Sequence, residues 1–213
     1  MVIDLKKDCT LTDLDIIGDL LQPMDKGADF VIGDNNYVWF YLIAKYYRPK
    51  VIAETGTRFG YSMKAFVNGA GHKLEKYSLW SYDSECDGIK TLDIFRDYFI
   101  QSLGINKLCI TRANTKTLTS IGANWVDLFL VDADHTTEGC YHECSLGFEA
   151  LKIGGVMVVD DVNFDDVKAG AEKFCADNNL SYTYLPSLRG IYLIEKKPRL
   201  NIITMRNPKP FTE

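Results

Sequence analysis

Hydrophobic residues follow two different rhythms from about residue 50 onward. Short runs of β-branched and other apolar residues alternate with stretches in which apolar residues recur every three or four positions. The short runs predict strands, near residues 50–54, 77–82, 107–111, 126–131 and 155–160. The longer stretches predict helices, near residues 60–68, 89–103, 115–121, 138–151 and 165–177. This alternation is typical of βαβ units, so we expect an α/β fold with a mainly parallel sheet.

The last two predicted strands, 181–185 and 190–195, are separated by only a few residues. Such a short connection permits a hairpin and excludes a parallel crossover. We therefore expect one antiparallel strand at the end of the sheet.

The N-terminal pattern predicts two helices, one near residues 10–21 that ends before Pro23 and another near 35–47. We therefore divide the chain into an N-terminal helical extension (residues 1–34), a main domain (35–196) and a C-terminal tail (197–213). Three prolines in the tail disfavour regular structure. We expect the tail to lie over its own domain; the alternative is an arm exchanged within a homodimer.

Charge and composition exclude several classes of partner. The 213 residues carry 24 basic and 29 acidic side chains, a net charge of −5, without a block of Lys and Arg that would attract nucleic acid. The chain starts without an apolar signal core, and no apolar run reaches the roughly 20 residues of a membrane-spanning helix. A cytoplasmic protein without membrane contact is therefore expected.

The six cysteines are scattered, which favours reduced thiols over a disulfide framework. Cys140 and Cys144 lie near His142 and resemble part of a metal site. Their spacing, however, continues through Gly147 and Phe148 as one apolar helix face. A structural zinc site would need a second pair of ligands. We interpret these cysteines as core residues.

A glycine-containing acidic segment, Glu-Thr-Gly-Thr-Arg-Phe-Gly at residues 54–60, follows the first predicted strand. Gly56 would allow a sharp turn, and Gly60 would let the next helix begin close to a ligand. The segment lacks the Gly-Lys-Ser/Thr of a phosphate loop and the Gly-x-Gly-x-x-Gly spacing of a dinucleotide site. Glu54 would oppose a pyrophosphate. The segment favours a cationic or amino-bearing ligand instead.

The second predicted strand leads to Asp83, the position of the ribose-binding acid in nucleoside-binding α/β folds. A carboxylate there can accept hydrogen bonds from both ribose hydroxyls. Glu85 could take this role instead. Considered alone, Asp83 could also be an ordinary solvent-exposed acid in a turn.

Residues 53–62 resemble the first motif of class I S-adenosylmethionine (SAM)-dependent methyltransferases. Residues 126–139 and 151–162 are similar to one subgroup, the macrocin-type O-methyltransferases and cephalosporin-hydroxylase-like proteins. The resemblance extends over about residues 50–196. It implies a Rossmann-like sheet with helices on both faces and an antiparallel last strand.

The resemblance also implies the cofactor site. Glu54, Gly56 and Gly60 would hold the methionine part of SAM, and Asp83 would hold the ribose. Asn114 would lie near the adenine, where the family commonly has Asp, and Asp132 would lie beside the methyl donor. Asn114, together with Ala133 in place of a frequent Gly, departs from the family pattern.

Four acids lie at two neighbouring strand ends, namely Asp132, Asp134, Asp160 and Asp161. Carboxylates crowded in this way repel one another unless they are protonated or joined by a cation, and Mg²⁺ prefers oxygen ligands. The resemblance assigns Asp132, Asp160 and Asp161 as metal ligands. The alternative is that Asp160 and Asp161 only cap the next helix or face solvent.

Two residues compete for the role of proton acceptor. The resemblance favours Asp134, whereas His135 has the more suitable ordinary pKa, near 6.5. His135 could instead orient an acid through a hydrogen bond.

The predicted function is therefore SAM-dependent, metal-assisted O-methylation of a small-molecule hydroxyl. A SAM-binding protein without methyl transfer and a hydroxylase-like enzyme of the same subgroup are the alternatives. Tyr37, Trp39 and Arg189 are candidates for the pocket wall by position alone.

Overall fold

The computed structural model describes residues 35–56, 60–71, 74–81 and 108–198. Seven strands form one sheet in the order β3-β2-β1-β4-β5-β7-β6. Their bounds are Val51–Thr55 (β1), Lys76–Ser81 (β2), Leu108–Arg112 (β3), Val126–Val131 (β4), Leu151–Val159 (β5), Thr183–Leu185 (β6) and Ile191–Glu195 (β7). The predicted α/β fold is confirmed.

The first five strands pair in parallel, and β7 pairs antiparallel with both β5 and β6. Strand β7, the last strand within the described residues, is antiparallel to its neighbours, as predicted. It lies between β5 and β6 and not at the end of the sheet, where the antiparallel strand was expected, so β6 forms the edge. The predicted hairpin supplies both of these strands.

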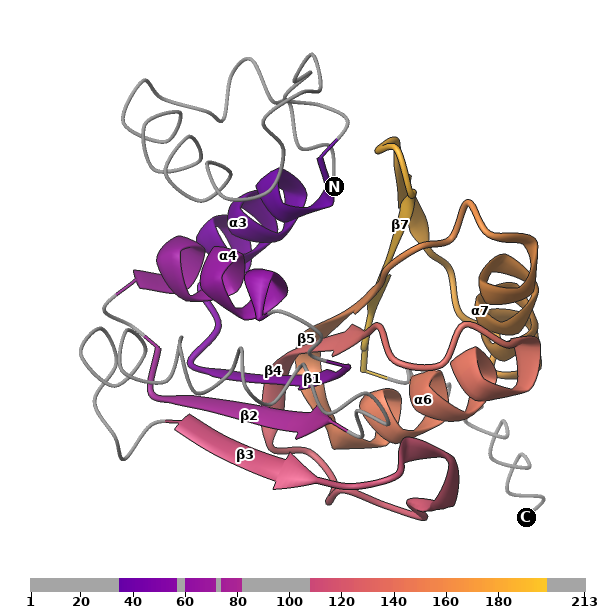
Figure 1. Cartoon of the computed structure of the whole chain (residues 1–213), viewed down its shortest axis with the longest axis horizontal. Coiled ribbons are helices and arrows are strands. Elements are labelled where there is room, and N and C mark those ends of the chain that lie inside the picture. Colours follow the sequence, from indigo (N-terminus) through magenta and orange to yellow (C-terminus); the bar gives the residue numbers. More distant parts are fainter. Residues whose placement is uncertain (1–34, 57–59, 72–73, 82–107, 199–213) are drawn as a thin grey trace, which may run out of the picture.

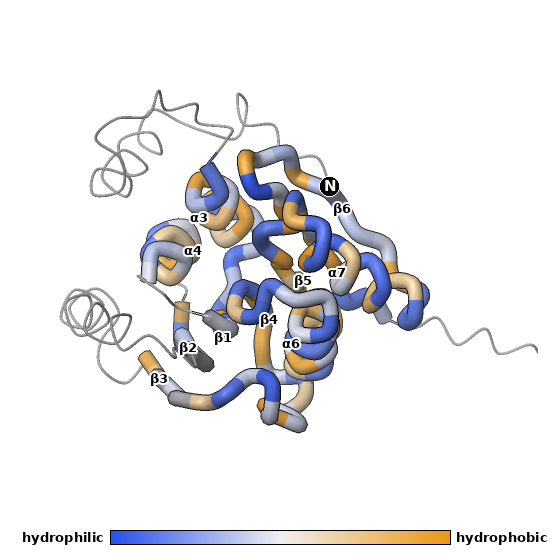
Figure 2. Tube along the Cα trace, turned by 45° about the vertical axis from the view of Figure 1, so that its right-hand side comes forward, coloured by the Kyte–Doolittle hydropathy of each residue, from blue (hydrophilic) through white to orange (hydrophobic). Residues whose placement is uncertain are grey.

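Helices cover both faces of the sheet (Figure 1). Helices α3 (Asn36–Tyr47) and α4 (Tyr61–Ala70) lie on one face. Helices α6 (Thr137–Ala150) and α7 (Asp165–Asp177) lie on the other. The tube of β4 at the centre of Figure 2 is largely hydrophobic, whereas outward turns of α6 are hydrophilic. None of the helices in the described ranges is long and apolar enough to span a bilayer.

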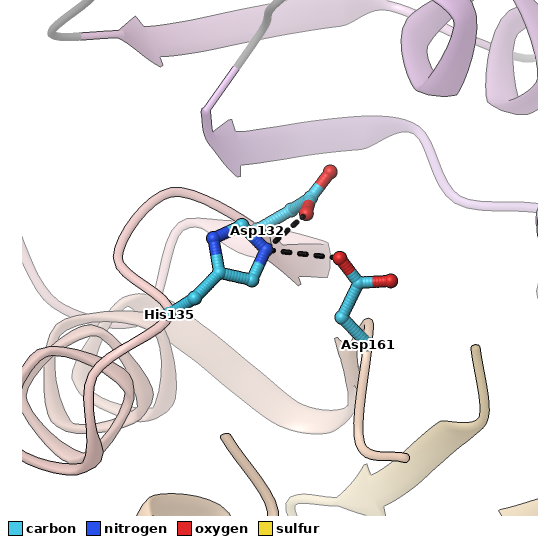
Figure 3. A group of neighbouring side chains, drawn as sticks. All are labelled: Asp132, His135 and Asp161. Carbon is cyan, nitrogen blue, oxygen red and sulfur yellow. Dashed lines mark hydrogen bonds and ion pairs between the residues drawn. The ribbon is translucent and has the colours of Figure 1, made fainter. Parts of the chain in front are cut away.

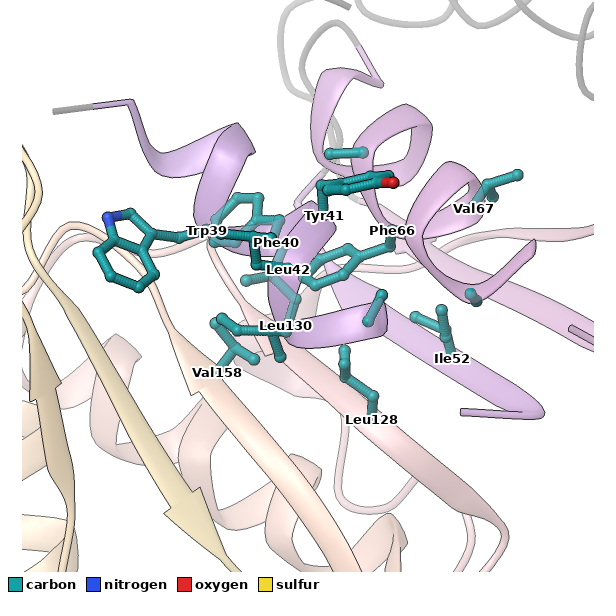
Figure 4. Close-up of a cluster of buried hydrophobic side chains, with 14 of the residues drawn as sticks. Trp39, Phe40, Tyr41, Leu42, Ile52, Phe66, Val67, Leu128, Leu130 and Val158 are labelled. Carbon is teal, nitrogen blue, oxygen red and sulfur yellow. The ribbon is translucent and has the colours of Figure 1, made fainter. Parts of the chain in front are cut away.

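The two hydrophobic cores follow from the alternation of side chains along β1, β4 and β5. Ile52, Leu128 and Val158 pack beneath α3 and α4 (Figure 4). Their neighbours Ala53, Phe129 and Val159 face α6 and α7 on the opposite side. Each central strand is therefore buried on both faces, which explains its nearly continuous apolar sequence.

Two predicted elements differ from the structure. Residues 115–121 were expected to be helical but form only a 3₁₀ turn, η4 (Thr115–Thr117). Asn114 accepts a hydrogen bond from the backbone N–H of Lys116, and Thr117 donates one to the Asn114 carbonyl, so local side chains replace the helical pattern. Strand β5 begins at Leu151, earlier than predicted, and its pairing with β4 is interrupted by a bulge between Leu151 and Val156.

Other sequence predictions lie outside the described residues. These are the helices near 10–21 and 89–103, the structure of the extension 1–34, the end of the tail, and Asp83 with Glu85. Within the described part, Cys140 and Cys144 are buried free thiols on α6, as predicted.

Candidate active site

The carboxyl ends of β1, β4 and β5 meet at one edge of the sheet. Thr55 pairs with Val131, and Val131 pairs with Val159, so the three strands end at the same level. The residues that follow them, Gly56, Asp132 and Asp160, are therefore brought together. In open α/β sheets this edge is where ligands bind.

Gly56 makes the turn after β1 and cannot be replaced by a larger residue without a clash. Its φ angle is 80°, and a Cβ atom there would lie 2.1 Å from the carbonyl oxygen of Asp132. Gly60 also has a positive φ, 71°, and is the N-cap of α4. The two glycines thus act as the sequence predicted, one as a sharp turn and the other at the start of a helix.

Glu54, the fourth residue of β1, is completely buried. One of its carboxylate oxygens, Oε2, accepts hydrogen bonds from Tyr77 Oη at 2.6 Å and from Ser62 Oγ at 3.1 Å. Burial raises the pKa of Glu54 to about 8, although both hydrogen bonds lower it. Its other oxygen, Oε1, has no hydrogen-bond partner among the described residues.

Three buried oxygens at this end of the molecule share that property. They are Asn36 Oδ1, Glu54 Oε1 and Glu143 Oε1, each without a hydrogen-bond partner within the described part of the chain. Every one of them is an acceptor. Because unpaired buried acceptors are costly, a ligand rich in N–H and O–H donors fits their surroundings. The amino and hydroxyl groups of an adenosyl amino acid meet this requirement.

Three side chains form a cluster that could hold a cation (Figure 3). One ligand atom from each of Asp132, His135 and Asp161 lies within 4.8 Å of the others. His135 Nε2 is 2.9 Å from Asp161 Oδ2 and 3.8 Å from Asp132 Oδ1. The side chain of Asp161 is 3% exposed, whereas that of His135 is 49% exposed, so the cluster opens toward solvent on the histidine side.

Asp160 lies beside this cluster but outside it. Its carboxylate accepts a hydrogen bond from Asn36 Nδ2 at the start of α3. Burial, followed by the charge of Asp161, raises the pKa of Asp160 to about 7. The pKa of Asp132 is raised well above its ordinary value by burial and then by the charges of Asp160 and Asp161. The acids therefore repel one another, as the sequence predicted.

Asp134 is directed away from the cluster. Its carboxylate lies 3.0 Å from Lys116 Nζ and accepts a hydrogen bond from the backbone N–H of Thr136. Burial raises the pKa of Asp134, but the bonds from Lys116 and Thr136 outweigh it and hold the pKa below its ordinary value. The structure thus brings His135, and not Asp134, to the acids.

The three candidates for the pocket wall have different positions. Arg189 Nη1 lies 3.4 Å from Asp161 Oδ2. Burial is the main cause of the raised pKa of Tyr37, and the charges of Asp132 and Asp160 raise it further, which places Tyr37 near the cluster. Trp39, in contrast, is 4% exposed and belongs to the core between α3 and the sheet.

Sequence reasoning missed Asn36, Lys116 and Glu143. Asn36 and Asp160 are 124 positions apart, and only the packing of α3 against the end of β5 joins them. Glu143 lies between the buried residues Cys140 and Cys144 of α6, and the apolar pattern around it was the only sequence signal that it is buried. Asn114 is the N-cap of η4, and no role beyond that cap is visible in its hydrogen bonds.

Comparisons with known proteins identify a family model and solved structures with the same fold. A family model described as a methyltransferase domain matches residues 53–162. A comparison with curated proteins found no match. An SAH-bound methyltransferase of Podospora anserina superposes with a TM-score of 0.59 and 17% identity over 89% of each chain.

Two further solved structures share the fold. An O-methyltransferase of Bacillus cereus in complex with SAH has a TM-score of 0.59 and 14% identity, over 88% of this chain and 92% of that one. The O-methyltransferase TomG of Streptomyces achromogenes in complex with SAM has a TM-score of 0.59 and 15% identity, over 89% and 92%. The family model spans more than half of the sequence, and so the chain belongs to the methyltransferase-domain family.

Proposed function

We propose that this chain transfers the methyl group of SAM to a hydroxyl oxygen of a small molecule. The observation that carries the proposal is the edge itself, where unpartnered buried acceptors lie close to a cluster of acids. The acceptors suit the donors of SAM, and the acids suit the activation of a hydroxyl group. The O-methyltransferases with the same fold support this choice of acceptor atom.

The cofactor would lie across the ends of β1, β2 and β4. Glu54 would accept hydrogen bonds from its amino group, and Gly56 and Gly60 would let the backbone approach its methionine part. Asp83 would bind the ribose, Asn114 would lie near the adenine, and Asp132 would lie beside the methyl donor. The resemblance to class I enzymes supports these assignments.

A divalent cation such as Mg²⁺ would be held by Asp132 and Asp161. Asp160, which lies beside them, would be the third ligand. Carboxylate oxygens are the ligands that a hard cation prefers, which leaves the imidazole of His135 for another role. When bound, the cation would supply Lewis acidity and a template for the acceptor. Asn36 would hold the carboxylate of Asp160 in place.

His135 is our preferred proton acceptor. It lies at the acids, and its half-exposed ring can reach an incoming hydroxyl group. The hydrogen bond to Asp161, the first cause of its raised pKa, would stabilise the imidazolium that forms when the proton arrives. Asp134 could serve only after its carboxylate leaves Lys116.

The net charge of −5 without a basic block supports a small-molecule acceptor over nucleic acid. The cysteines of the described residues are free thiols, which supports a reducing compartment, the cytoplasm.

Calorimetry with SAM and with SAH tests the cofactor. Binding in the micromolar range is expected, and Asp83→Ala should weaken it roughly 10- to 150-fold, since a hydrogen bond to a charged group contributes about 1.5 to 3 kcal/mol. Glu75→Ala is the control. Glu75 is an exposed acid that forms an ion pair with Lys50, and it lies just before β2, at the opposite end of the strands from the cofactor edge. No heat with either ligand, together with clear binding of NAD, would contradict the proposal.

The acceptor can be sought with a panel of sugars and phenols by measuring SAH release from SAM. Release with a hydroxyl compound is expected. Tight SAH binding without release from any acceptor would favour the SAM-binding alternative.

A further inference from the structure

Glu143 is a buried acid to which the reaction assigns no role. It lies in the middle of α6, and its residue is 1% exposed. Its Oε2 atom accepts a hydrogen bond from Thr55 Oγ1 at 3.0 Å and another from the backbone N–H of Ala133 at 3.2 Å. Thr55 ends β1 and Ala133 follows β4, so one carboxylate joins two of the segments that surround the cofactor edge.

The same carboxyl group also reaches the segment after β3. Burial is the main cause of the raised pKa of Glu143, whereas Thr115 and the backbone at Asp134 lower it. The buried Thr115, the first residue of η4, and Glu143 line the same cavity. The next residue along the helix, His142, forms a hydrogen bond with the Thr115 carbonyl at 3.0 Å. Helix α6 therefore holds η4 through two consecutive side chains.

Each of the three segments carries residues assigned to the cofactor. Thr55 precedes Gly56, Thr115 follows Asn114, and Ala133 follows Asp132. A Cβ atom at Gly56 would lie 2.1 Å from the carbonyl oxygen of Asp132, so the segments after β1 and β4 pass very close to each other. Glu143 also borders a cavity of about 280 Å³ between η4 and the start of α6.

Fold stability does not explain an acid at this position. Burial of a carboxyl group is costly, and one oxygen of Glu143 has no hydrogen-bond partner among the described residues. Its charge also adds to the raised pKa of Asp132. An apolar residue would avoid both costs, as in the rest of the buried face of α6.

We propose that Glu143 is a positioning residue, which fixes the segments after β1, β3 and β4 in the arrangement that binds the cofactor. The inference rests on the proposed function, because it assumes that SAM occupies this edge. Glu143 acts through Thr55, Thr115 and the backbone at Ala133, without touching the reacting atoms. Its loss should therefore raise the Kd of SAH and the KM of SAM, while kcat at saturating SAM changes little.

The test compares Glu143→Gln with Glu149→Gln by calorimetric titration with SAH. Glutamine keeps the shape of Glu143 but replaces one carboxylate oxygen with an NH₂ donor. This donor would face either the Ala133 N–H or the position of Oε1, which has no hydrogen-bond partner among the described residues. We expect SAH binding to weaken roughly 10- to 150-fold, the effect of losing a hydrogen bond to a charged group. Glu149 is exposed on the same helix and accepts a hydrogen bond from Ser120, so its variant controls for loss of charge on α6.

A second pair of variants covers a failure of Glu143→Gln to fold. Thr55→Val removes one donor to Glu143 with little change in shape, whereas Thr55→Ser keeps the hydroxyl group. Weak SAH binding by Thr55→Val and its recovery in Thr55→Ser are expected. Unchanged SAH binding in a folded Glu143→Gln, or in Thr55→Val, would overturn the inference. Wild-type protein that binds no SAH would overturn the proposed function itself, which separates the two failures.

Discussion

Methyl transfer by this chain is expected to fall at least about 100-fold when EDTA removes divalent cations, and to recover when Mg²⁺ is returned. The reason is the charge at the site, where burial and mutual repulsion raise the pKa values of Asp132 and Asp160. A bound cation would relieve this repulsion, and metal ions contribute several kcal/mol of charge stabilisation in such reactions. The measurement is SAH release with the acceptor found in the panel.

Asp161→Asn should reproduce the effect of EDTA, because Asp161 belongs to the cation cluster. Asp165→Asn is the matched control, since Asp165 is an exposed acid in the first turn of α7. Calorimetry with Mg²⁺ adds a readout that needs no acceptor, and the control should bind the cation like the wild type. Full turnover after exhaustive chelation would remove the metal from the mechanism.

The second large effect is expected at the proton acceptor. His135→Gln should lower turnover by roughly 10²- to 10⁴-fold, the usual contribution of a general base, and leave SAH binding almost unchanged. Asp134→Asn should keep most of the activity, because Asp134 is occupied by Lys116 and Thr136. Both variants are compared for turnover and for the Kd of SAH.

The pH dependence separates the same two candidates. A base works only when it is deprotonated, so the rate falls as the pH drops through its pKa. With His135 the fall begins at near-neutral pH, because its ordinary pKa is about 6.5 and its bond to Asp161 raises it. With Asp134, whose pKa is held below its ordinary value by the bonds from Lys116 and Thr136, the rate would persist into acidic pH. A nearly inactive Asp134→Asn beside an active His135→Gln would return the role to Asp134.

The sequence predicted the central strands well because they are buried on both faces of the sheet. Val126–Val131 is almost wholly apolar and its bounds were predicted without error. The segment after β3 was predicted less well, since Asn114 and Thr117 form local hydrogen bonds that hydrophobic periodicity does not register.

The positions of the acids at the strand ends could be predicted, because the hydrophobic pattern of a strand shows where the strand ends. The direction in which each side chain points could not be predicted. Asp134 turns to Lys116, a residue of another segment, and Asp160 turns to Asn36 on the first described helix. Glu143 was missed because its only sequence signal is the apolar pattern around it, and the donors to its carboxylate come from distant segments of the chain.

A crystal of the chain soaked with SAH and Mg²⁺ would show directly whether this edge is the active site. We expect SAH across the ends of β1, β2 and β4, with its amino group at Glu54 and its sulfur beside Asp132, and a cation between Asp132 and Asp161. An edge that stays without SAH under these conditions, yet binds NAD in a parallel soak, would contradict this expectation.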